Sequence, residues 1–275
     1  MKNILITGAK SYIGDSVRNY LMQYPNDYTV DVIDTLGLEP EPKFFKSYDV
    51  VFNVAGIAHI KETKENRHLY YDINRDLVIR IAKAAREGGV KQFILLSTMS
   101  VYGLTTGHIT KETIPHPNNS YGESKLQADE QIRLLENDAF LFACLRPPMV
   151  YGKGCKGNYQ SLRKFALKSP IFPNYQNERS MIYIGNLAEF VKCCIDEEKR
   201  GLFFPQNSEY TKTSEMVSLI AQNNGKDIRL TKAFNCFLKL PANVLKKVFG
   251  NLTYEKTDTI SLFDFNESVR LTEGK

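Results

Sequence analysis

The first 34 residues follow an order that few folds accommodate: an apolar run, a glycine turn, an amphipathic helix and a second apolar run. Residues 2–7 predict a buried strand, and residues 12–24 carry apolar positions at helical spacing. Between them, Gly8 permits a tight turn and Gly14 lets the helix pack closely on the strand. Main-chain N–H groups at the start of such a helix bind phosphate oxygens. The order is therefore typical of the first half of a dinucleotide-binding unit.

One position of this turn departs from the usual glycine pattern. Ser11 stands where the pattern has glycine, so a Cβ occupies space that the phosphates approach, while its hydroxyl can donate a hydrogen bond to them. We expect the turn and the first helical residues to bind the pyrophosphate; these residues are Gly8, Ser11, Tyr12, Ile13 and Gly14.

The second predicted strand, residues 28–33, ends at Asp34. This is about twenty residues past the turn, where dinucleotide-binding folds place the acid that binds the ribose hydroxyls. A carboxylate there repels a 2′-phosphate, so NAD is favoured over NADP as the cofactor. The alternative is an aspartate that only forms the turn at the strand end.

Buried-type strands continue to alternate with helices after this point. Strands are predicted at residues 49–54 and 92–96, with a long amphipathic helix at residues 69–87 between them and a short connection at residues 35–46. Such alternation predicts an α/β fold with a doubly wound parallel sheet. Ligands then bind at the carboxyl ends of the strands.

Several small or polar residues follow these strand ends. Ala55 and Gly56 come after the third strand, and their main chain can lie against a cofactor. Ser97 and Thr98 come directly after the fourth strand, at the same edge of the sheet. His59 is interpreted as a loop histidine near the pocket rather than as a catalytic base.

Tyr121 and Lys125 are four residues apart in a predicted helix, so they lie on one face of it. A nearby ammonium group favours the phenolate, and we expect it to lower the tyrosine pKa toward neutral pH. Such a tyrosine can exchange a proton with a sugar hydroxyl or a carbonyl. The spacing alone also occurs on many solvated helices. The spacing indicates a catalytic pair here because the nucleotide-binding pattern and Ser97 and Thr98 lie upstream of it.

Composition narrows the class of protein. The 275 residues are 43% hydrophobic and 24% charged, and the net charge of +5 comes from scattered basic residues, so nucleic acid is not implied. The five cysteines form no C-x-x-C pair, which indicates reduced thiols and no metal site. No signal peptide and no transmembrane stretch is visible, so we expect a soluble cytoplasmic protein.

Together these motifs resemble the extended short-chain dehydrogenase/reductase family, in its NAD-dependent epimerase/dehydratase group. The resemblance covers most of the chain and implies a Rossmann-type sheet with a smaller C-terminal substrate-binding lobe. The motifs that carry it are Thr7-Gly8, Ile13-Gly14, Asp34, Asp49 to Gly56, Asn74, Ser97 to Gly103, Tyr121 with Lys125, Leu145 to Gly152, and Arg179-Ser180 with Tyr183 to Ala188.

The resemblance implies a role for each of several residues. Tyr121 is the general acid and base, Lys125 holds the nicotinamide ribose and lowers the tyrosine pKa, and Thr98 hydrogen-bonds the reacting sugar oxygen. Hydride passes between the sugar carbon and the nicotinamide. The remaining expected cofactor contacts are Ala55, Gly56, Asn74, Ser97 and Pro147, and the expected substrate contacts are Ser100, Asn158 and Arg179, the last of these on the pyrophosphate.

Two departures from the family pattern bear on which reaction and which kind of pocket to expect. Family dehydratases carry an acidic pair directly after the threonine, and Met99 and Ser100 stand in its place, so a dehydratase is disfavoured. The C-terminal part is also short for the family, so the substrate pocket is expected to be open or completed by a partner. The resemblance suggests a homodimer formed through the helices that include Tyr121.

The second half is predicted to bind the substrate: residues 1–152 form the NAD-binding domain, and residues 153–275 are mainly a substrate lobe with some segments that return to the first domain. The glycine- and lysine-bearing loop at residues 153–159 suits a nucleotide diphosphate or is simply solvated. A helix at residues 237–249 caps this lobe or, as the less favoured alternative, lies on a membrane surface. Residues 251–275 show little pattern and are expected to end in a disordered tail.

The leading hypothesis is a 4-epimerase of a UDP-sugar or another nucleotide sugar that uses bound NAD, in surface polysaccharide synthesis. The runner-up is an NAD(P)H-dependent 4-keto-sugar reductase. From another class, the chain could be a non-catalytic dinucleotide sensor, which an intact set of Thr98, Tyr121 and Lys125 argues against. A lipid-linked sugar remains open as the substrate.

Overall fold

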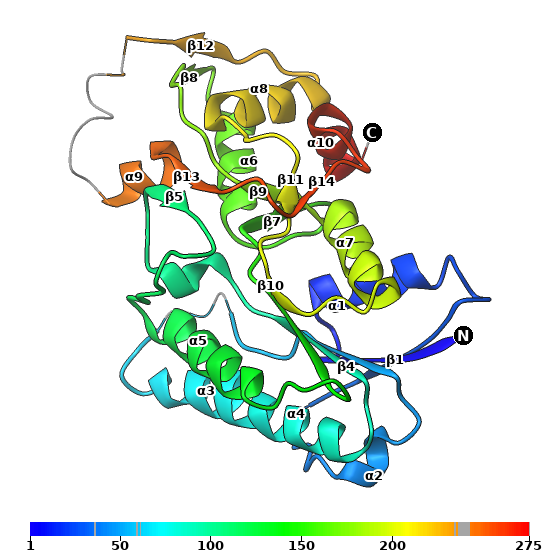
Figure 1. Ribbon diagram of the computed structural model, residues 1–275. Helices are drawn as coiled ribbons and strands as arrows, with labels where there is room; N and C mark the ends of the chain where they lie inside the picture. The colour runs from blue at the N-terminus through cyan, green and yellow to red at the C-terminus, as the bar shows by residue number, and fades with distance from the viewer. Residues whose placement is uncertain (36, 59, 61, 234, 236–242, 275) are drawn as a thin grey trace. The chain divides into compact units, whose positions relative to one another are not determined.

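The computed structural model describes residues 1–35, 37–58, 60, 62–233, 235 and 243–274 (Figure 1). Two compact units are present. Unit 1 consists of Met1–Gly103, Ile114–Pro147 and Leu187–Phe204, and unit 2 consists of Leu104–Thr113, Pro148–Asn186 and the residues from Pro205 on. These units are defined by packing alone, and the predicted division of binding roles at residue 152 stays a prediction. His59 and Cys236 lie outside the described residues.

Unit 1 is built on a six-stranded sheet in the order β10-β6-β4-β3-β1-β2, with every neighbouring pair parallel. The predicted doubly wound α/β fold is therefore confirmed. The strands are β1 (Lys2–Thr7), β2 (Tyr28–Ile33), β3 (Val50–Asn53), β4 (Gln92–Leu96), β6 (Leu141–Leu145) and β10 (Gly201–Phe203).

Helices cover both faces of this sheet. Figure 1 shows α1 and α7 on one face and α3, α4 and α5 on the other. Because both faces are covered, the central strands are apolar without alternation, as in β1, where Ile4, Leu5 and Ile6 are all fully buried. The helices are α1 (Tyr12–Leu21), α2 (Pro42–Phe45), α3 (Arg67–Tyr71), α4 (Val78–Glu87), α5 (Ser120–Arg133) and α7 (Ile184–Asp196), of which α7 enters unit 1 at Leu187.

The helix predicted at residues 69–87 is not regular throughout. It begins earlier, at Arg67, and a π-helical turn, η1 (Asp72–Leu77), separates α3 from α4. Such turns are frequent at functional sites. Buried Asn74 lies inside this turn.

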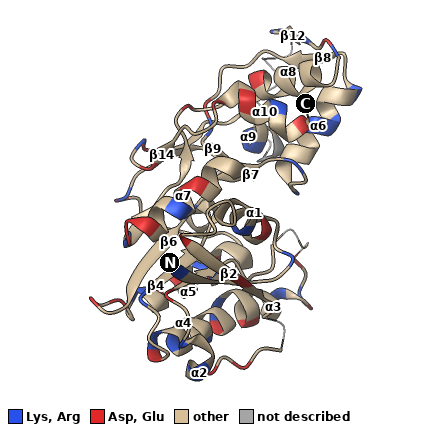
Figure 2. Ribbon diagram, turned by 90° about the vertical axis from the view of Figure 1, so that its right-hand side faces the viewer, with Lys and Arg blue, Asp and Glu red and all other residues tan. Residues whose placement is uncertain are grey.

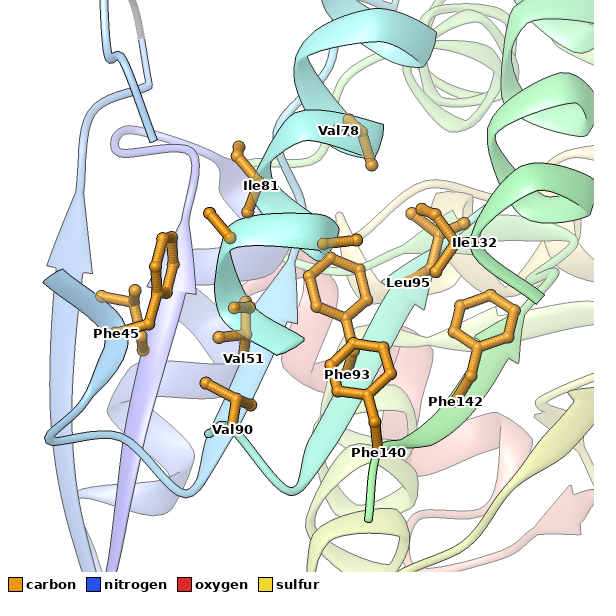
Figure 3. Close-up of a cluster of buried hydrophobic side chains, with 14 of the residues drawn as sticks. Phe45, Val51, Val78, Ile81, Val90, Phe93, Leu95, Ile132, Phe140 and Phe142 are labelled. Atoms are coloured by element: carbon orange, nitrogen blue, oxygen red, sulfur yellow. The ribbon is translucent and has the colours of Figure 1, made fainter. Parts of the chain in front are cut away.

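The main hydrophobic core of unit 1 lies between the sheet and α4 and α5 (Figure 3). Phe93, Phe140 and Phe142 are fully or almost fully buried, and the rings of Phe93 and Phe140 have centroids 6.1 Å apart. Ile81 of α4 and Ile132 of α5 pack against the same cluster. The cluster thus fixes α4 and α5 to the sheet.

Unit 2 is a set of short parallel strand pairs and helices. β7 (Met149–Tyr151) pairs with β9 (Met181–Tyr183), β8 (Ile171–Pro173) with β12 (Arg229–Thr231), β5 (Gly107–Ile109) with β13 (Leu252–Tyr254), and β11 (Gln206–Asn207) with β14 (Thr259–Ile260). The helices are α6 (Asn158–Lys168), α8 (Thr213–Asn223), α9 (Asn243–Phe249) and α10 (Phe265–Glu273).

The expectation of a disordered C-terminal tail is wrong. Residues 252–273 contain two strands and α10, whose N-terminus is capped because Asp264 accepts a hydrogen bond from Glu267 N at 2.8 Å. Glu273 accepts hydrogen bonds from Tyr159 and Arg163, which hold the end of α10 against α6. Of the helix predicted at residues 237–249, the part before Asn243 lies outside the described residues.

Candidate active site

The glycine turn after β1 lies against the main chain that follows β3. Gly8 has φ +106°, and a Cβ there would come within 2.8 Å of Ala55 N. Both the backbone conformation and the space therefore require glycine. The N–H groups of Gly8 and Ala9 donate to Ile33 O at 3.0 and 2.9 Å, which fixes the turn beside the end of β2.

The end of β2 presents the predicted ribose-binding acid. Asp34 follows Ile33 directly and is exposed. Because Ile33 O accepts hydrogen bonds from the glycine turn, Asp34 lies next to that turn in space as well as at the carboxyl edge of the sheet.

Ser11 caps helix α1 instead of acting as a flexible turn residue. Its φ of −78° needs no glycine, and its hydroxyl accepts a hydrogen bond from Gly14 N at 3.3 Å. The serine thus takes one of the helix N–H groups. Tyr12 and Ile13 form the first turn of α1 and are half-buried. A Cβ at Gly14 would come within 2.9 Å of Val54 Cγ2, so the helix approaches the sheet closely there.

Asn74 organises the loop after β3. Its Oδ1 accepts from Ile57 N at 2.7 Å, and its Nδ2 donates to Ile57 O at 3.1 Å and to Ser124 Oγ at 3.4 Å. A Cβ at Gly56 would come within 2.8 Å of Asn74 Oδ1 and 3.0 Å of Lys125 Nζ. Asn74 therefore positions the main chain at Gly56 beside Lys125, and its predicted contact with the cofactor stays a prediction.

Lys125 is buried under this loop. Its ammonium donates to Leu96 O at 3.1 Å and to Ala55 O at 3.4 Å, and only 4% of the residue is exposed. Burial lowers the pKa of Lys125 to about 8, because removal from water disfavours the charged form.

We expect Lys125→Met to change how stability depends on pH. The folded-state pKa is lowered from the ordinary value, so wild-type stability increases as pH rises from about 8 toward 10.5, by up to about 3 kcal/mol. Methionine removes this dependence. The free energy of unfolding of the variant, relative to wild type, should therefore be higher at pH 7 than at pH 10. Urea unfolding of NAD-stripped protein at both pH values measures this, and Lys91→Met, at an exposed lysine, is the control. A difference between Lys125→Met and wild type that is independent of pH would contradict the expectation.

Tyr121 and Thr98 interact at the start of α5. Burial raises the pKa of Tyr121 above its ordinary value, the side-chain interaction with Thr98 lowers it, and the neighbouring Tyr70 raises it. Of the described residues, only Thr98 and Tyr70 shift this pKa by interaction, so the expectation that Lys125 lowers it is wrong for this structure. The physical reason is that the Lys125 ammonium is bound to main-chain carbonyls and Tyr121 is itself partly removed from water.

A 3₁₀ turn, η2 (Met99–Tyr102), brings Thr98 and Ser100 to α5. Thr98 Oγ1 accepts from Ser100 N at 3.1 Å. A Cβ at Gly122 would come within 2.6 Å of Ser100 O. The turn and the helix are thus in close contact at this glycine, and a larger residue would clash. Met99 N donates to Pro147 O at 3.0 Å, which adds the predicted Pro147 to the same place.

Below this turn lies a charge network that the sequence interpretation missed. Asp129 of α5 is fully buried, and its carboxylate receives Arg146 at 2.5 Å and Arg133 at 3.0 Å. Arg146 also donates to Tyr102 Oη at 2.7 Å. The sequence showed only part of this network: Tyr121, Lys125 and Asp129 recur every fourth residue on one helix face, but the spacing does not identify Arg146 as the partner of Asp129. The network ties α5, which carries Tyr121, to η2, which directly follows Thr98.

Two of the predicted substrate-binding residues belong to unit 2. Arg179 Nη1 donates to Gly250 O at 2.8 Å, and burial lowers the pKa of the guanidinium. Among the described residues no carboxylate lies within ion-pair distance of Arg179, so its charge is uncompensated by protein. Asn158 is the exposed first residue of α6. The site described above is built from residues of unit 1, and these two residues are not among them.

Comparison with known proteins agrees with this geometry. Residues 4–203 match the family model described as the NAD dependent epimerase/dehydratase family. The chain belongs to this family. It is accordingly an enzyme of the extended short-chain dehydrogenase/reductase type, and the expectation of NAD as the cofactor is confirmed at the level of the family.

Individual relatives are named as 4-epimerases. The chain is 31% identical over 246 residues to a UDP-glucose 4-epimerase of Vibrio cholerae, which covers 80% of this chain and 75% of the relative. It is also 31% identical over 211 residues to an N-acetyl-alpha-D-glucosaminyl-diphospho-ditrans,octacis-undecaprenol 4-epimerase of Escherichia coli O157:H7, with 69% and 62% covered. A crystal structure of UDP-glucuronic acid 4-epimerase from Bacillus cereus in complex with NAD superposes with a TM-score of 0.79 at 18% identity, over 98% of this chain and 95% of that one.

The residues of unit 1 fit NAD. Two buried polar atoms at the carboxyl ends of neighbouring strands, Ser97 Oγ and Asn53 Nδ2, have no hydrogen-bond partner in the part of the chain that the structure describes. Buried polar groups normally bind a partner, and a bound dinucleotide would lie at this edge. The glycine turn at Gly8 and the N-terminus of α1 are available for its phosphates.

Two further findings concern membrane-spanning helices and the cysteines. Among the described residues no helix is long and apolar enough to cross a membrane. The described cysteines are Cys144, Cys155, Cys193 and Cys194; none of these four forms a disulfide, and all but Cys193 are buried.

Proposed function

We propose that this protein is a 4-epimerase of a diphosphate-activated sugar that keeps NAD bound between turnovers. The observation that carries the proposal is the placement of Thr98, directly after β4, and of Tyr121 and buried Lys125, at the start of α5, at the carboxyl edge of a dinucleotide-binding sheet, where the Lys125 ammonium donates to Leu96 O. Met99 and Ser100 follow Thr98, and neither side chain can serve as the acid or base of a dehydratase.

The residues that would hold NAD are those gathered at this edge. Gly8, Ser11 and Gly14 would lie under the pyrophosphate, and Asp34 would bind the adenine-side ribose. Ser97 and Lys125 would face the nicotinamide half, where Asn74 fixes the loop at Gly56; the remaining expected cofactor contacts are Tyr12, Ile13, Ala55 and Pro147. NAD would supply the redox chemistry there, as a hydride acceptor for C4 of the sugar and, once the 4-keto sugar has turned over, as the hydride donor to its other face.

Tyr121 would exchange the proton of the C4 hydroxyl. Its interaction with Thr98 favours the ionised form, while burial opposes it. Thr98 would hydrogen-bond the sugar oxygen, and Lys125, which keeps its charge below about pH 8, would donate to the ribose next to Tyr121. Each residue thus positions or moves one proton, and the cofactor supplies the redox chemistry.

The substrate would be recognised mainly through its diphosphate. Arg179 carries a charge that no described carboxylate compensates, and it can bind two phosphate oxygens at once. Ser100 and Asn158 would contact other parts of the substrate. The substrates named for the two 31% identical relatives, UDP-glucose and an undecaprenol-linked glucosaminyl diphosphate, share a sugar on a diphosphate. We therefore infer that the diphosphate, and not the group beyond it, is the common requirement.

The runner-up from the sequence, a 4-keto-sugar reductase, uses the same residues in one direction with exchanging cofactor. Both relatives at 31% identity are named as 4-epimerases, which favours the epimerase. The non-catalytic sensor is not supported, because the chain belongs to an enzyme family. A homodimer through α5, the cytoplasmic location and the role in surface polysaccharide synthesis stay predictions.

The direct test is an assay for C4 inversion without added cofactor. UDP-glucose, UDP-galactose, their N-acetylated forms and the UDP-uronic acids are incubated with purified protein, and proton NMR follows the C4 epimers. We expect the same equilibrium mixture from either epimer of one pair. Inversion that requires added NAD(P)H, or reduction of a 4-keto sugar alone, would reject the proposal in favour of the reductase.

A further inference from the structure

The first residue of α5 is held by two side chains from elsewhere in unit 1. Ser120, which directly precedes Tyr121, is only 1% exposed. Its hydroxyl donates to Glu62 Oε1 at 2.7 Å, and its N–H donates to Glu62 Oε2 at 3.2 Å. Arg67 Nε donates to the same hydroxyl at 2.8 Å and lies 3.8 Å from Glu62 Oε1. One carboxylate thus binds both hydrogen-bond donors of a buried residue that is 58 positions away along the chain.

The N–H of Ser120 is a group that a helix cannot satisfy by itself. The first N–H groups of an α-helix have no carbonyl of a preceding turn to bind. The side chain of Asn119, the residue before the helix, takes another of them, since its Oδ1 accepts from Gly122 N at 2.9 Å. Glu62 supplies an acceptor for Ser120 N from outside the helix, and its negative charge is favourable at a helix N-terminus. The first turn of α5 is therefore anchored in part by Glu62.

The main chain on either side of Glu62 is also bound. Tyr70 Oη of α3 donates to Ile60 O at 2.8 Å. Thr63 N donates to Asn66 Oδ1 at 2.8 Å, and Asn66 N donates to Thr63 Oγ1 at 3.3 Å, which closes a turn directly after Glu62. Because the chain is bound at Ile60 and again at Thr63, the carboxylate of Glu62 is presented to α5 from a fixed position.

A local contact, and not the overall charge of unit 1, distinguishes Glu62. Figure 2 shows basic and acidic residues interspersed on the helices of unit 1. The side chain of Glu62 is 34% exposed, so water screens its charge beyond its immediate partners. Glu65 is a second exposed acid of the same stretch, and its carboxylate interacts with Thr63. Glu62 and Glu65 thus carry the same charge and differ in what they contact.

We propose that Glu62 is a positioning residue for Tyr121. By binding Ser120 it fixes the first turn of α5, so that the phenol hydroxyl of Tyr121 stays at the reacting oxygen of the sugar. The inference rests on the proposed function, in which Tyr121 exchanges the proton of the C4 hydroxyl. Glu62 is not among the residues proposed to bind NAD or the sugar, so it acts on the chemical step and not on binding.

The test replaces Glu62 by glutamine, which keeps the shape of the side chain. One carboxylate oxygen becomes an NH₂ group, and this group cannot accept a hydrogen bond from Ser120. We expect kcat for C4 inversion to fall about tenfold, because misplacement of a reacting group by about 1 Å can cost up to about 100-fold. KM and the NAD content should stay unchanged. Rates are measured well below the Tm of each variant, where a loss of stability alone leaves kcat unchanged.

Glu65→Gln is the matched control for this variant. It removes the same charge three residues further along the chain, where the carboxylate interacts with Thr63. We expect its kcat to equal that of wild type. An equal fall of kcat in both variants, or wild-type kcat in Glu62→Gln, would overturn the proposal.

Ser120→Pro tests whether Glu62 acts through Ser120. Proline has neither the N–H nor the hydroxyl, and it is favoured at the first helical position. Asn119 is extended, with φ −155° and ψ 161°, as a residue before proline prefers. In this background Glu62 has no partner at position 120, so the double variant should be no slower than Ser120→Pro alone. Effects that multiply would show that Glu62 acts by another route and would overturn the proposal.

The position of the Tyr121 ring can also be followed without turnover. In protein whose tyrosines carry carbon-13 at Cζ, the NMR signal of Tyr121 is the one that disappears in Tyr121→Phe. We expect Glu62→Gln and Ser120→Pro to shift this signal and Glu65→Gln to leave it in place. A shifted signal in a protein that inverts no sugar would reject the proposed function and leave the role of Glu62 in positioning Tyr121 standing. C4 inversion with kcat and signal both unaffected by Glu62→Gln would do the reverse.

Discussion

Replacement of Tyr121 by phenylalanine is expected to lower kcat by a factor of about 10²–10⁴, because the proton of the C4 hydroxyl then has no acceptor. The ring, and with it the packing against Tyr70 at a centroid distance of 6.4 Å, is preserved. We therefore expect bound NAD and thermal stability to change little. Initial rates of C4 inversion, on the substrate that the NMR assay identifies, measure the effect.

Tyr70→Phe is the matched control for this variant. Tyr70 lies beside Tyr121, and its hydroxyl donates to Ile60 O at 2.8 Å. Loss of that hydrogen bond should cost about 1 kcal/mol of stability and leave kcat within a few-fold of wild type. If Tyr121→Phe retains wild-type activity, or if both variants lose activity equally, Tyr121 is not the acid and base.

Replacement of Arg146 by methionine is expected to have the largest effect on stability. The change leaves the carboxylate of Asp129 fully buried without its closest partner, at 2.5 Å in the wild type. Breaking a buried pair from one side costs about 3–5 kcal/mol, which lowers Tm by about 10 °C for a chain of this size. Differential scanning calorimetry measures this. Since Arg146 joins α5 to η2 through Asp129 and Tyr102, kcat should fall as well.

Arg133→Met provides the comparison at the same carboxylate. Arg133 binds the other oxygen of Asp129 at 3.0 Å, but its side chain is 41% exposed. Asp129 keeps Arg146 in this variant, and the Arg133 side of the pair is open to water, so the loss should be about 1 kcal/mol, or about 2–4 °C. Equal losses in Tm for the two variants would show that the buried Arg146–Asp129 pair stabilises the fold no more than the Arg133–Asp129 pair does.

The local part of the fold could be predicted because local patterns determine it. The strands at Lys2–Thr7, Tyr28–Ile33 and Gln92–Leu96 were predicted with their observed bounds, since each is an apolar run bounded by turn residues. The parallel sheet followed from the alternation of strands and helices. The position of Tyr121, Lys125 and Thr98 followed from the same alternation, because strand ends and helix starts share one edge.

What the sequence did not yield depends on contacts between distant elements. Asp129 on α5 meets Arg146 after β6, and nothing in either local pattern pairs them. The hydrogen bonds of Asn74 to the main chain of Ile57 were not foreseen, because no local pattern showed the π-helical turn that contains Asn74; its cofactor contact stays a prediction. Helix α10 was missed because its packing depends on Glu273 reaching α6, a contact made 110 residues away along the chain.

The pKa of Tyr121 shows the same limit. Spacing along one helix places Lys125 near Tyr121, but it does not show that the ammonium is already bound by the carbonyls of Leu96 and Ala55. Helical spacing therefore identified the two residues, but the effect on the pKa of Tyr121 that was inferred from it was wrong.

The most direct test of the central claim is the cofactor content of the purified protein. The protein is denatured, and the released nucleotide is identified by mass and quantified by absorbance against the protein concentration. We expect close to one NAD per chain without any addition, because an epimerase returns its hydride in each turnover and has no need to exchange the cofactor. Protein that is purified empty and consumes NADH or NADPH in proportion to product would contradict a recycled cofactor and, with it, the epimerase.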